Sequence, residues 1–391
     1  HTARPRCVHD RCCTAIGRSV RSIFRRLSLG AAAPIMALVF AIAASSLVLL
    51  VAGSNPLRAY GDMVNHASKL ETMVDILNRA TPLFISGIAA AIGFRMNLFN
   101  IGVEGQYLLA ALVAAHVGGL IDLPAPLHIA VILLVGMTVG ATYSGVAGVL
   151  KVSRGISEVI STLMLNIIAT SGLIVAGLKL WQAGGAVGGN VTRVGTEEIP
   201  KSGRIPDLNG FVEIFTRDIG RDRRLTGVLL VAIAVGVGYH VLLNRSRFGF
   251  DLRASGGNPF AAQAGGVSPK RMVVLAMVLS GAVAGLVGMT EIMQGGLFPA
   301  NPIQGLGFAG IAVALLGRNS AFGAAVAALI FAFLDISSGI LQSTGSASRE
   351  IVQIMQGLII LAAVVAYQVT QRVRDREEAK AASAALSGAA A

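Results

Sequence analysis

The sequence predicts an all-α, polytopic membrane protein with about ten transmembrane helices, each needing roughly 20 mostly apolar residues. Three observations support this fold class: 54% of the residues are hydrophobic, only 13% are charged, and the mean hydropathy is +0.71. A soluble globular chain carries about 25% charged residues, so half of the usual charge is missing. This composition excludes a disordered chain and disfavours a soluble enzyme.

The candidate spans follow one another along most of the chain. They cover 31–53, 76–95, 100–120, 128–150, 156–179, 225–243, 271–291, 305–317, 320–341 and 351–370. The eighth is short and rich in glycine, and we expect a broken or re-entrant element near 295–317. A backbone of that kind is stable at membrane depth only where protein or water covers it.

Two of the spans carry glycines at the G-x-x-x-G spacing that lets helices approach closely in lipid. Gly136 and Gly140 form this pattern in the fourth span, and Gly281 and Gly285 form it in the seventh. The pattern predicts close helix packing and carries no information about a substrate.

The basic residues predict which side of the membrane each end occupies. The arm 1–29 is rich in arginine, and most Lys and Arg of the short connections fall on the same side as this arm. The short outer connections hold few basic residues: Arg58, Lys69, Arg79 and Arg349. The long outer stretch 179–224 holds eight more, together with six acidic residues. Because cytoplasmic loops collect Lys and Arg, we predict an N-in, C-in topology. The net charge of +12 therefore reflects topology, and no nucleic-acid partner is expected.

The chain divides into a basic cytoplasmic arm over 1–29, a transmembrane domain over 30–371 and a low-complexity cytoplasmic tail over 372–391. The transmembrane domain contains an external stretch over 179–224 that is rich in Gly, Pro and charge. This stretch is either a docking surface for an external partner or a simple cap on a helical hairpin.

A cytoplasmic loop over 244–271 carries the signals of a short helix. Asn258 suits the N-cap and Pro259 suits the first helical position, while Gly265 and Gly266 can end the helix. A short exposed helix between basic flanks fits the groove of another protein. The alternative is an interfacial connector.

The chain lacks the motifs of common catalytic sites. No Gly-Lys dipeptide occurs, which excludes a P-loop and ATP hydrolysis by this chain, and neither H-E-x-x-H nor G-x-S-x-G occurs. The three cysteines all precede Thr14, so no disulfide framework is expected, and their spacing with His1 and His9 fits no zinc pattern. We expect no catalytic residue, no metal and no cofactor.

Polar residues inside apolar spans are costly in lipid and normally face the bundle interior or a water-filled path. Glu158, Thr162 and Asn166 recur every fourth residue and share one helix face. Asp335 lies alone in the ninth span. The candidate path residues are Asn97, Asn100, Glu104, Gln106, Glu158, Thr162, Asn166, Gln294, Asn301 and Gln304. Such a set suits a neutral, polyhydroxylated solute. The alternative is that these groups hydrogen-bond the helices to one another.

Four sequence blocks together resemble the permease subunits of bacterial ABC importers, in the branch that imports nucleosides and simple sugars. The blocks are FRMNLFNIGVEGQYLLAAL (94–112), GISEVISTLMLNIIA (155–169), LRASGGNPFAAQAGGVSPKRM (252–272) and GLGFAGIAVALLGRNSAFG (305–323). The resemblance covers roughly 80–370, with the blocks in the expected order.

The resemblance implies a transport subunit that forms the translocation path for nucleosides and is not itself an enzyme. It implies three partners: a cytoplasmic ABC ATPase, typically with tandem nucleotide-binding domains, a second permease subunit and an extracytoplasmic solute-binding lipoprotein. It also places the chain in the bacterial plasma membrane. Ser157 departs from the Asn that is common in the nucleoside branch.

The resemblance further implies that 252–271 is the loop that couples the permease to the ATPase. The matching positions are Arg253, Gly256, Asn258, Pro259, Ala261, Ala262, Gly265 and Gly266. A charged residue at Ala262 is expected to break docking while the fold is retained.

Two other functions fit parts of the pattern. A simple-sugar importer for ribose-like solutes would share the same architecture. An ion-coupled secondary transporter would need no ATPase, but its inverted repeats are not visible in the sequence.

Overall fold

The computed structural model describes residues 39–40, 42–51, 53–181, 195–212 and 224–343, with scattered residues between 351 and 365. The arm 1–29, the tail 372–391 and most of the tenth predicted span lie outside these residues. The chain divides into two units, Leu57–Ser346 and a second made of 1–56 with 347–391. Every site below lies in the first unit.

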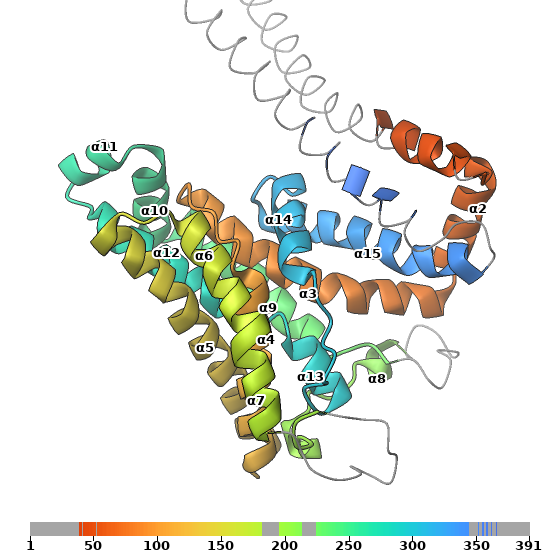
Figure 1. The fold of residues 1–391 in the computed structure, drawn as a ribbon, viewed down its shortest axis with the longest axis horizontal. Coiled ribbons are helices and arrows are strands. Elements are labelled where there is room, and N and C mark those ends of the chain that lie inside the picture. Colours follow the sequence, from red (N-terminus) through yellow and green to blue (C-terminus); the bar gives the residue numbers. More distant parts are fainter. Residues whose placement is uncertain are drawn as a thin grey trace, which may run out of the picture. The chain divides into compact units, whose positions relative to one another are not determined.

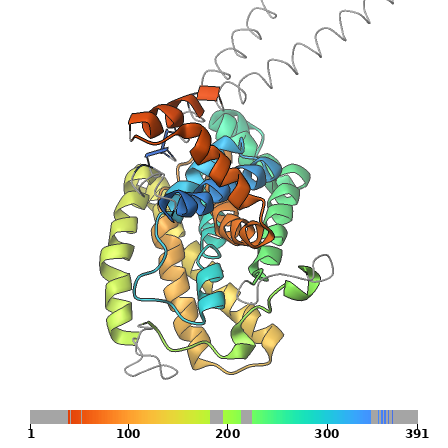
Figure 2. The same cartoon turned by 90° about the vertical axis from the view of Figure 1, so that its right-hand side faces the viewer.

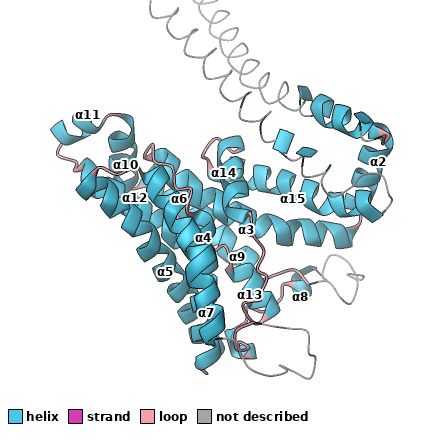
Figure 3. Cartoon of the chain, in the orientation of Figure 1, coloured by secondary structure: helices cyan, strands magenta, loops and turns pink. Residues whose placement is uncertain are grey.

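The described residues are helical almost throughout, and their only β-type pairing is an isolated bridge between Gly195 and Pro299 (Figures 1 and 3). The α-helices are α2 (Pro56–Ala67), α3 (Leu70–Arg95), α4 (Val103–Leu120), α5 (Ala125–Arg154), α6 (Glu158–Ile167), α7 (Ile174–Trp181), α8 (Asn209–Val212), α9 (Val228–Arg245), α10 (Arg247–Gly257), α11 (Pro259–Ala264), α12 (Pro269–Ala284), α13 (Met289–Gly295), α14 (Leu306–Leu316) and α15 (Ala321–Ser343).

Within the described part of the chain, 7 helical stretches are long and apolar enough to cross a membrane. They are α3, α4, α5, the stretch Glu158–Trp181 that combines α6 and α7, α9, the stretch Pro269–Gly295 that combines α12 and α13, and α15 as far as Leu341. Counting Ile42–Val51 and Pro56–Ala67 as one broken span would give 8. The all-α membrane fold is confirmed, with fewer described spans than predicted.

The predicted eighth span forms α14, which has 11 residues. At about 1.5 Å per residue, a helix of this length is too short to cross a hydrocarbon core about 30 Å thick. The loop from Gly296 to Gly305 separates it from α13. This arrangement agrees with the expected broken element near 295–317.

The spans differ in how much of their surface the protein itself covers. In the most apolar part of α3, 72% of the residues are buried, whereas only 28% are buried in α5 and in α9. Large apolar side chains such as Leu134 and Val237 stay exposed on these outer helices. We infer that α3 lies at the centre of the bundle and that α5 and α9 face lipid.

The most extensive helix contact joins α5 to α12, and it uses both G-x-x-x-G patterns. A Cβ added at Gly285 would lie 2.0 Å from the carbonyl oxygen of Gly136, and one added at Gly140 would lie 2.2 Å from that of Gly281. No side chain fits at these distances. The two patterns therefore pack against each other, as small-residue helix contacts do in membranes.

The described part of the external stretch packs over the end of the bundle that holds α13. The backbone N–H of Thr196 donates to Phe298 at 3.1 Å, and that of Ile199 donates to Gly296 at 2.7 Å. Beyond the stretch, the N–H of Thr226 donates to Asn78 Oδ1 at 2.9 Å. Helices α10 and α11 lie at the opposite end of the bundle from α13 (Figures 1 and 2).

Candidate functional site

A buried carboxylate holds the N-terminus of α14 against α4. Glu104, in the first turn of α4, accepts hydrogen bonds from the backbone N–H of Gly305 at 2.5 Å and of Gly307 at 2.7 Å. The Tyr107 hydroxyl also donates to it, at 2.9 Å. The first N–H groups of a helix lack intrahelical partners and carry positive partial charge. Glu104 therefore caps a helix that lies some 200 positions later in the chain.

A second buried network joins the α3–α4 loop to α4 and α12. The Asn100 side-chain amide donates to Gln106 Oε1 at 3.0 Å and to Ser280 Oγ at 2.9 Å. Ser280 in turn donates to the carbonyl of Ala89 in α3 at 2.7 Å. Asn97 lies outside this network, exposed, with a φ of 58° at the end of α3.

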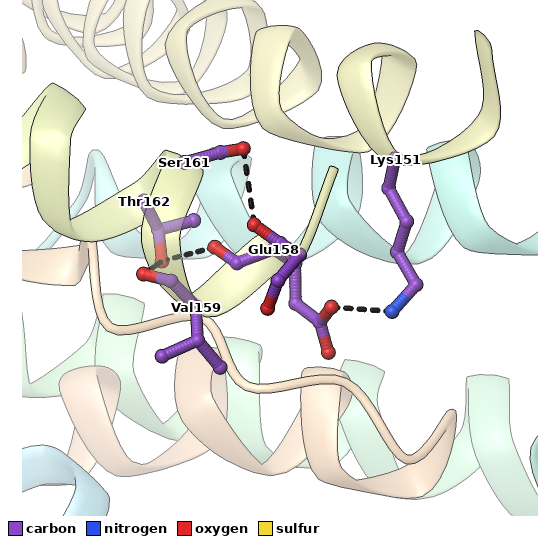
Figure 4. A network of polar contacts seen from close by, with 6 residues as sticks. Lys151, Glu158, Val159, Ser161 and Thr162 are labelled. Carbon is purple, nitrogen blue, oxygen red and sulfur yellow. Dashed lines mark hydrogen bonds and ion pairs between the residues drawn. The ribbon is translucent and has the colours of Figure 1, made fainter. Parts of the chain in front are cut away.

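The third group lies where α5 turns into α6 (Figure 4). Lys151 at the end of α5 forms an ion pair with Glu158 at the start of α6. Thr162 donates to the Glu158 carbonyl at 2.7 Å, and Asn166 accepts from the backbone N–H of Gly105. Glu158, Thr162 and Asn166 are all buried, so the predicted shared face is confirmed.

Six predicted path residues are thus buried, and each makes a polar contact within the chain: Asn100, Glu104, Gln106, Glu158, Thr162 and Asn166. The Thr162 hydroxyl bonds back within α6, and the other contacts join separate segments of the bundle. Bonding of this kind between helices was the alternative to a path. Asn301 and Gln304 are exposed in the loop before α14. A role of all these residues in the path stays a prediction.

A cavity of about 300 Å³ lies between α3, α13 and α15. It is lined by Asp75, Asn78, Arg79, Pro82, Val287, Gly288, Thr290, Glu291, Gln294, Ile303, Leu306 and Ile336. Of the predicted path residues, Gln294 lines it. The sequence singled out Gln294 as a polar path residue and Asp335 as a lone charge, but neither signal shows which side chains meet.

The charged side chains around this cavity are engaged within the chain. Arg79 forms an ion pair with Asp335, which the sequence left without a partner. The Glu291 carboxylate accepts from the N–H of Ile303, at 3.1 and 3.2 Å. Arg79 lies within α3 and not in an outer connection. Helix α3 begins at Leu70, before the predicted start of this span.

The predicted cytoplasmic helix is present as α11. Asn258 caps it, its Oδ1 accepting from the N–H of Phe260 at 3.0 Å and of Ala261 at 3.1 Å. Pro259 is the first helical residue, and Gly265 follows the last. Gly266 has a φ of 84°, a left-handed conformation that favours glycine.

Helix α10 seats this element on the bundle. A Cβ at Gly256 would lie 2.6 Å from the carbonyl oxygen of Arg95, so only glycine lets α10 approach the end of α3. Arg95 in turn donates to the carbonyl of Asn319 at 2.8 Å, and the Tyr239 hydroxyl donates to the same oxygen at 2.6 Å. The end of α3 is therefore a junction between α9, α10 and the turn before α15.

Phe260 on α11 is 84% exposed, whereas Ala262 is only 6% exposed. The expectation that a charge at Ala262 would leave the fold intact is therefore wrong, because the side chain would be buried within the element. The hydrophobic surface that α11 offers is centred on Phe260.

The apolar spans and the polar groups buried between them define a multi-pass membrane protein. Residues 72–364 match the family described as "Branched-chain amino acid transport system / permease component". The match covers most of the chain, and the protein belongs to this family.

The chain is 32% identical to the guanosine ABC transporter permease protein of Bacillus subtilis, over 86% of this chain and 93% of that protein. It is 32% identical to the glucose ABC transporter permease protein of Haloferax volcanii, over 84% and 85%. It is 29% identical to the nucleoside ABC transporter permease protein of Lactococcus lactis, over 84% and 88%. No solved structure matches the chain.

Each of these organisms also has a second ABC transporter permease relative, at 26% or 27% identity. All of these relatives are named as ABC transporter permeases, and they support the class of a transport subunit for this chain.

Proposed function

We propose that this chain is the permease subunit of an ATP-driven ABC importer and forms the translocation path for nucleosides. The observation that carries the proposal is the similarity, over most of both chains, to permeases named for guanosine and nucleosides. The cavity between α3, α13 and α15 supports a path for a neutral, hydroxyl-rich solute.

The proposed partner on the inner side is a cytoplasmic ABC ATPase with tandem nucleotide-binding domains. Helix α11 supports this contact because it is capped, short and centred on the exposed Phe260. The proposed coupling positions are Arg253, Gly256, Asn258, Pro259, Ala262, Gly265 and Gly266. In this scheme Phe260 contacts the ATPase, while Gly256 keeps α10 seated on α3.

The other proposed partners are a second permease subunit and a solute-binding lipoprotein outside the bacterial plasma membrane. A heterodimeric pair is supported by the second, less similar permease relative in each of three organisms. The external stretch 179–224 is the proposed contact for the lipoprotein.

The proposed mechanism contains no bond chemistry in this chain. ATP binding and hydrolysis move the ATPase, and α11 passes this motion to α12 and, through α10, to the end of α3. Because the cavity lies between α3 and α13, such a motion alters the cavity. The path then opens alternately to the two sides of the membrane.

Uptake of labelled nucleosides tests the proposal. Deleting the coding sequence should abolish ATP-dependent uptake of guanosine, and the wild-type chain should restore it. Unchanged uptake, in a strain with no second nucleoside system, would refute the nucleoside function.

A simple-sugar importer is the second candidate, and the glucose permease relative favours it. Uptake of labelled glucose and ribose by the same strains separates the two functions. Loss of sugar uptake with normal guanosine uptake would select the sugar function. An ion-coupled transporter gains no support from these relatives.

A further inference from the structure

The cavity is built from one face of each of two helices. Helix α3 contributes Asp75, Asn78, Arg79 and Pro82, whose spacing of three and four residues places them on the same side of a helix. Helix α13 contributes Thr290, Glu291 and Gln294. This regular arrangement gives the cavity two polar walls, and apolar residues such as Leu306 close it.

Most of the polar capacity of these walls is already used. Arg79 is paired with Asp335, and Glu291 holds the backbone of Ile303. The Asn78 amide donates to Arg224 at 2.8 Å and accepts from Thr226 at 2.9 Å. A charged ligand would have to compete with these contacts.

Two neutral groups on α13 retain free capacity. Thr290 is 8% exposed, and its hydroxyl has no hydrogen-bond partner among the described residues. The side chain of Gln294, one turn later, is exposed, and it has no hydrogen bond to the described residues. The Thr290 hydroxyl oxygen is itself buried, and a buried polar group without a partner is destabilising. Because Thr290 lines the cavity, rotation of its side chain would bring this hydroxyl to a ligand there.

The size and lining of the cavity favour a sugar over a nucleobase. None of the described residues that line it is aromatic, so it offers no surface on which a base can stack. Its volume lies at the lower end of the range for small-molecule sites, about 300–1,000 Å³. A ring with several hydroxyls and no charge matches these walls best.

We propose that this cavity binds the sugar ring of the transported solute, that Thr290 and Gln294 hydrogen-bond its hydroxyls, and that the base lies outside it. The inference rests on the proposed transport function and deepens it. It also accounts for similarity to permeases named for nucleosides and for glucose, because these solutes share a polyhydroxylated ring.

The test compares uptake of guanosine, cytidine and 2′,3′-dideoxyguanosine in cells that express the complete importer. Thr290→Val and Gln294→Leu should each raise KM for both ribonucleosides by the same factor, about three- to tenfold, which is the worth of one neutral hydrogen bond. The dideoxy analogue lacks the 2′- and 3′-hydroxyls, which are the ones attached to the ring itself, so its KM should change little.

The controls separate hydrogen bonding from folding. Thr290→Ser retains the hydroxyl and should raise KM less than Thr290→Val does. Thr138→Val makes the same change on α5, where the hydroxyl bonds back to Leu134 at 2.7 Å, and should keep a wild-type KM. The membrane level of each variant is measured by immunoblot.

The outcomes distinguish the two proposals. If cells with the wild-type importer took up neither nucleosides nor sugars, the proposed function would be refuted. Wild-type uptake would be normal in the second case. The assignment of this cavity to the sugar would then be overturned if the variants changed KM for only one of the two ribonucleosides, or changed it as much for the dideoxy analogue as for the ribonucleosides.

Discussion

Arg79 in α3 and Asp335 in α15 form an ion pair across 256 positions of the sequence. Asp335 is the one charged residue of α15, whereas Arg79 shares α3 with other charged residues such as Asp75. A lone charge in an apolar span is costly unless it is paired or reaches water. Their side chains are 25% and 36% exposed. The pair joins two helices beside the cavity, and we expect it to set their spacing there.

We predict that Asp335→Asn lowers the thermal stability of the detergent-solubilised protein and that Arg79→Asp with Asp335→Arg recovers part of the loss. A partly exposed pair has a coupling energy of about 1 kcal/mol. The measurement is a double-mutant cycle on the melting temperature. A coupling energy near zero would show that the pair does not hold α3 to α15.

Glu104→Gln should destabilise α14 and reduce uptake. The substitution puts an NH₂ group where two backbone N–H groups now donate, and leaving one of them unpaired in the interior costs about 1–3 kcal/mol. Glu197→Gln, on the exposed external stretch, is the matched control. Equal melting temperatures for the two variants would contradict a capping role for Glu104.

Gly285→Ala should destabilise the α5–α12 contact by roughly 1–3 kcal/mol, the typical cost of overpacking. The added methyl group would overlap the backbone of Gly136. Gly238→Ala in α9 is the control, because no atom lies within 4 Å of its added Cβ. The melting temperatures of both variants are measured. A higher melting temperature for Gly285→Ala would show that the two helices can separate freely to accommodate the methyl group.

Phe260→Asp should abolish co-purification of the ATPase and ATP-driven uptake without changing the melting temperature. The side chain is exposed, so its loss removes a contact surface and no core packing. Ala262→Asp should lower the melting temperature instead, and Phe260→Leu should keep docking. Retained docking in Phe260→Asp would exclude α11 as the ATPase contact.

Local signals in the sequence were sufficient for the cytoplasmic helix. The cap at Asn258, Pro259 at the first turn and Gly266 after the last all act within a few residues, and all three are as predicted. The glycine patterns of α5 and α12 were also visible. The sequence did not show that the two patterns pack against each other, because the spacing of glycines along one helix does not specify the helix that it contacts.

The cavity could not be predicted for the same reason. Its walls combine α3 with α13 and α15, far apart in the chain. Hydropathy also misplaced the start of α3, because the segment Leu70–Asp75 carries charge and was left outside the span. Arg79 was counted with the outer connections because of its charge, although it lies inside the predicted span 76–95. The sequence singled out Glu104 as a polar residue. It could not show its backbone partners, Gly305 and Gly307, because they lie far along the chain at the N-terminus of α14.

The apolar stretch Pro269–Gly295 begins just after α11 and ends with Thr290 and Gln294 at the cavity. Its 27 residues would cover about 40 Å as an α-helix. With the ATPase bound at α11 and the solute bound beside α13, the two sites would share one structural element. Binding at the two sites is then thermodynamically reciprocal: a nucleotide state that weakens solute binding must itself be disfavoured by solute, by the same factor.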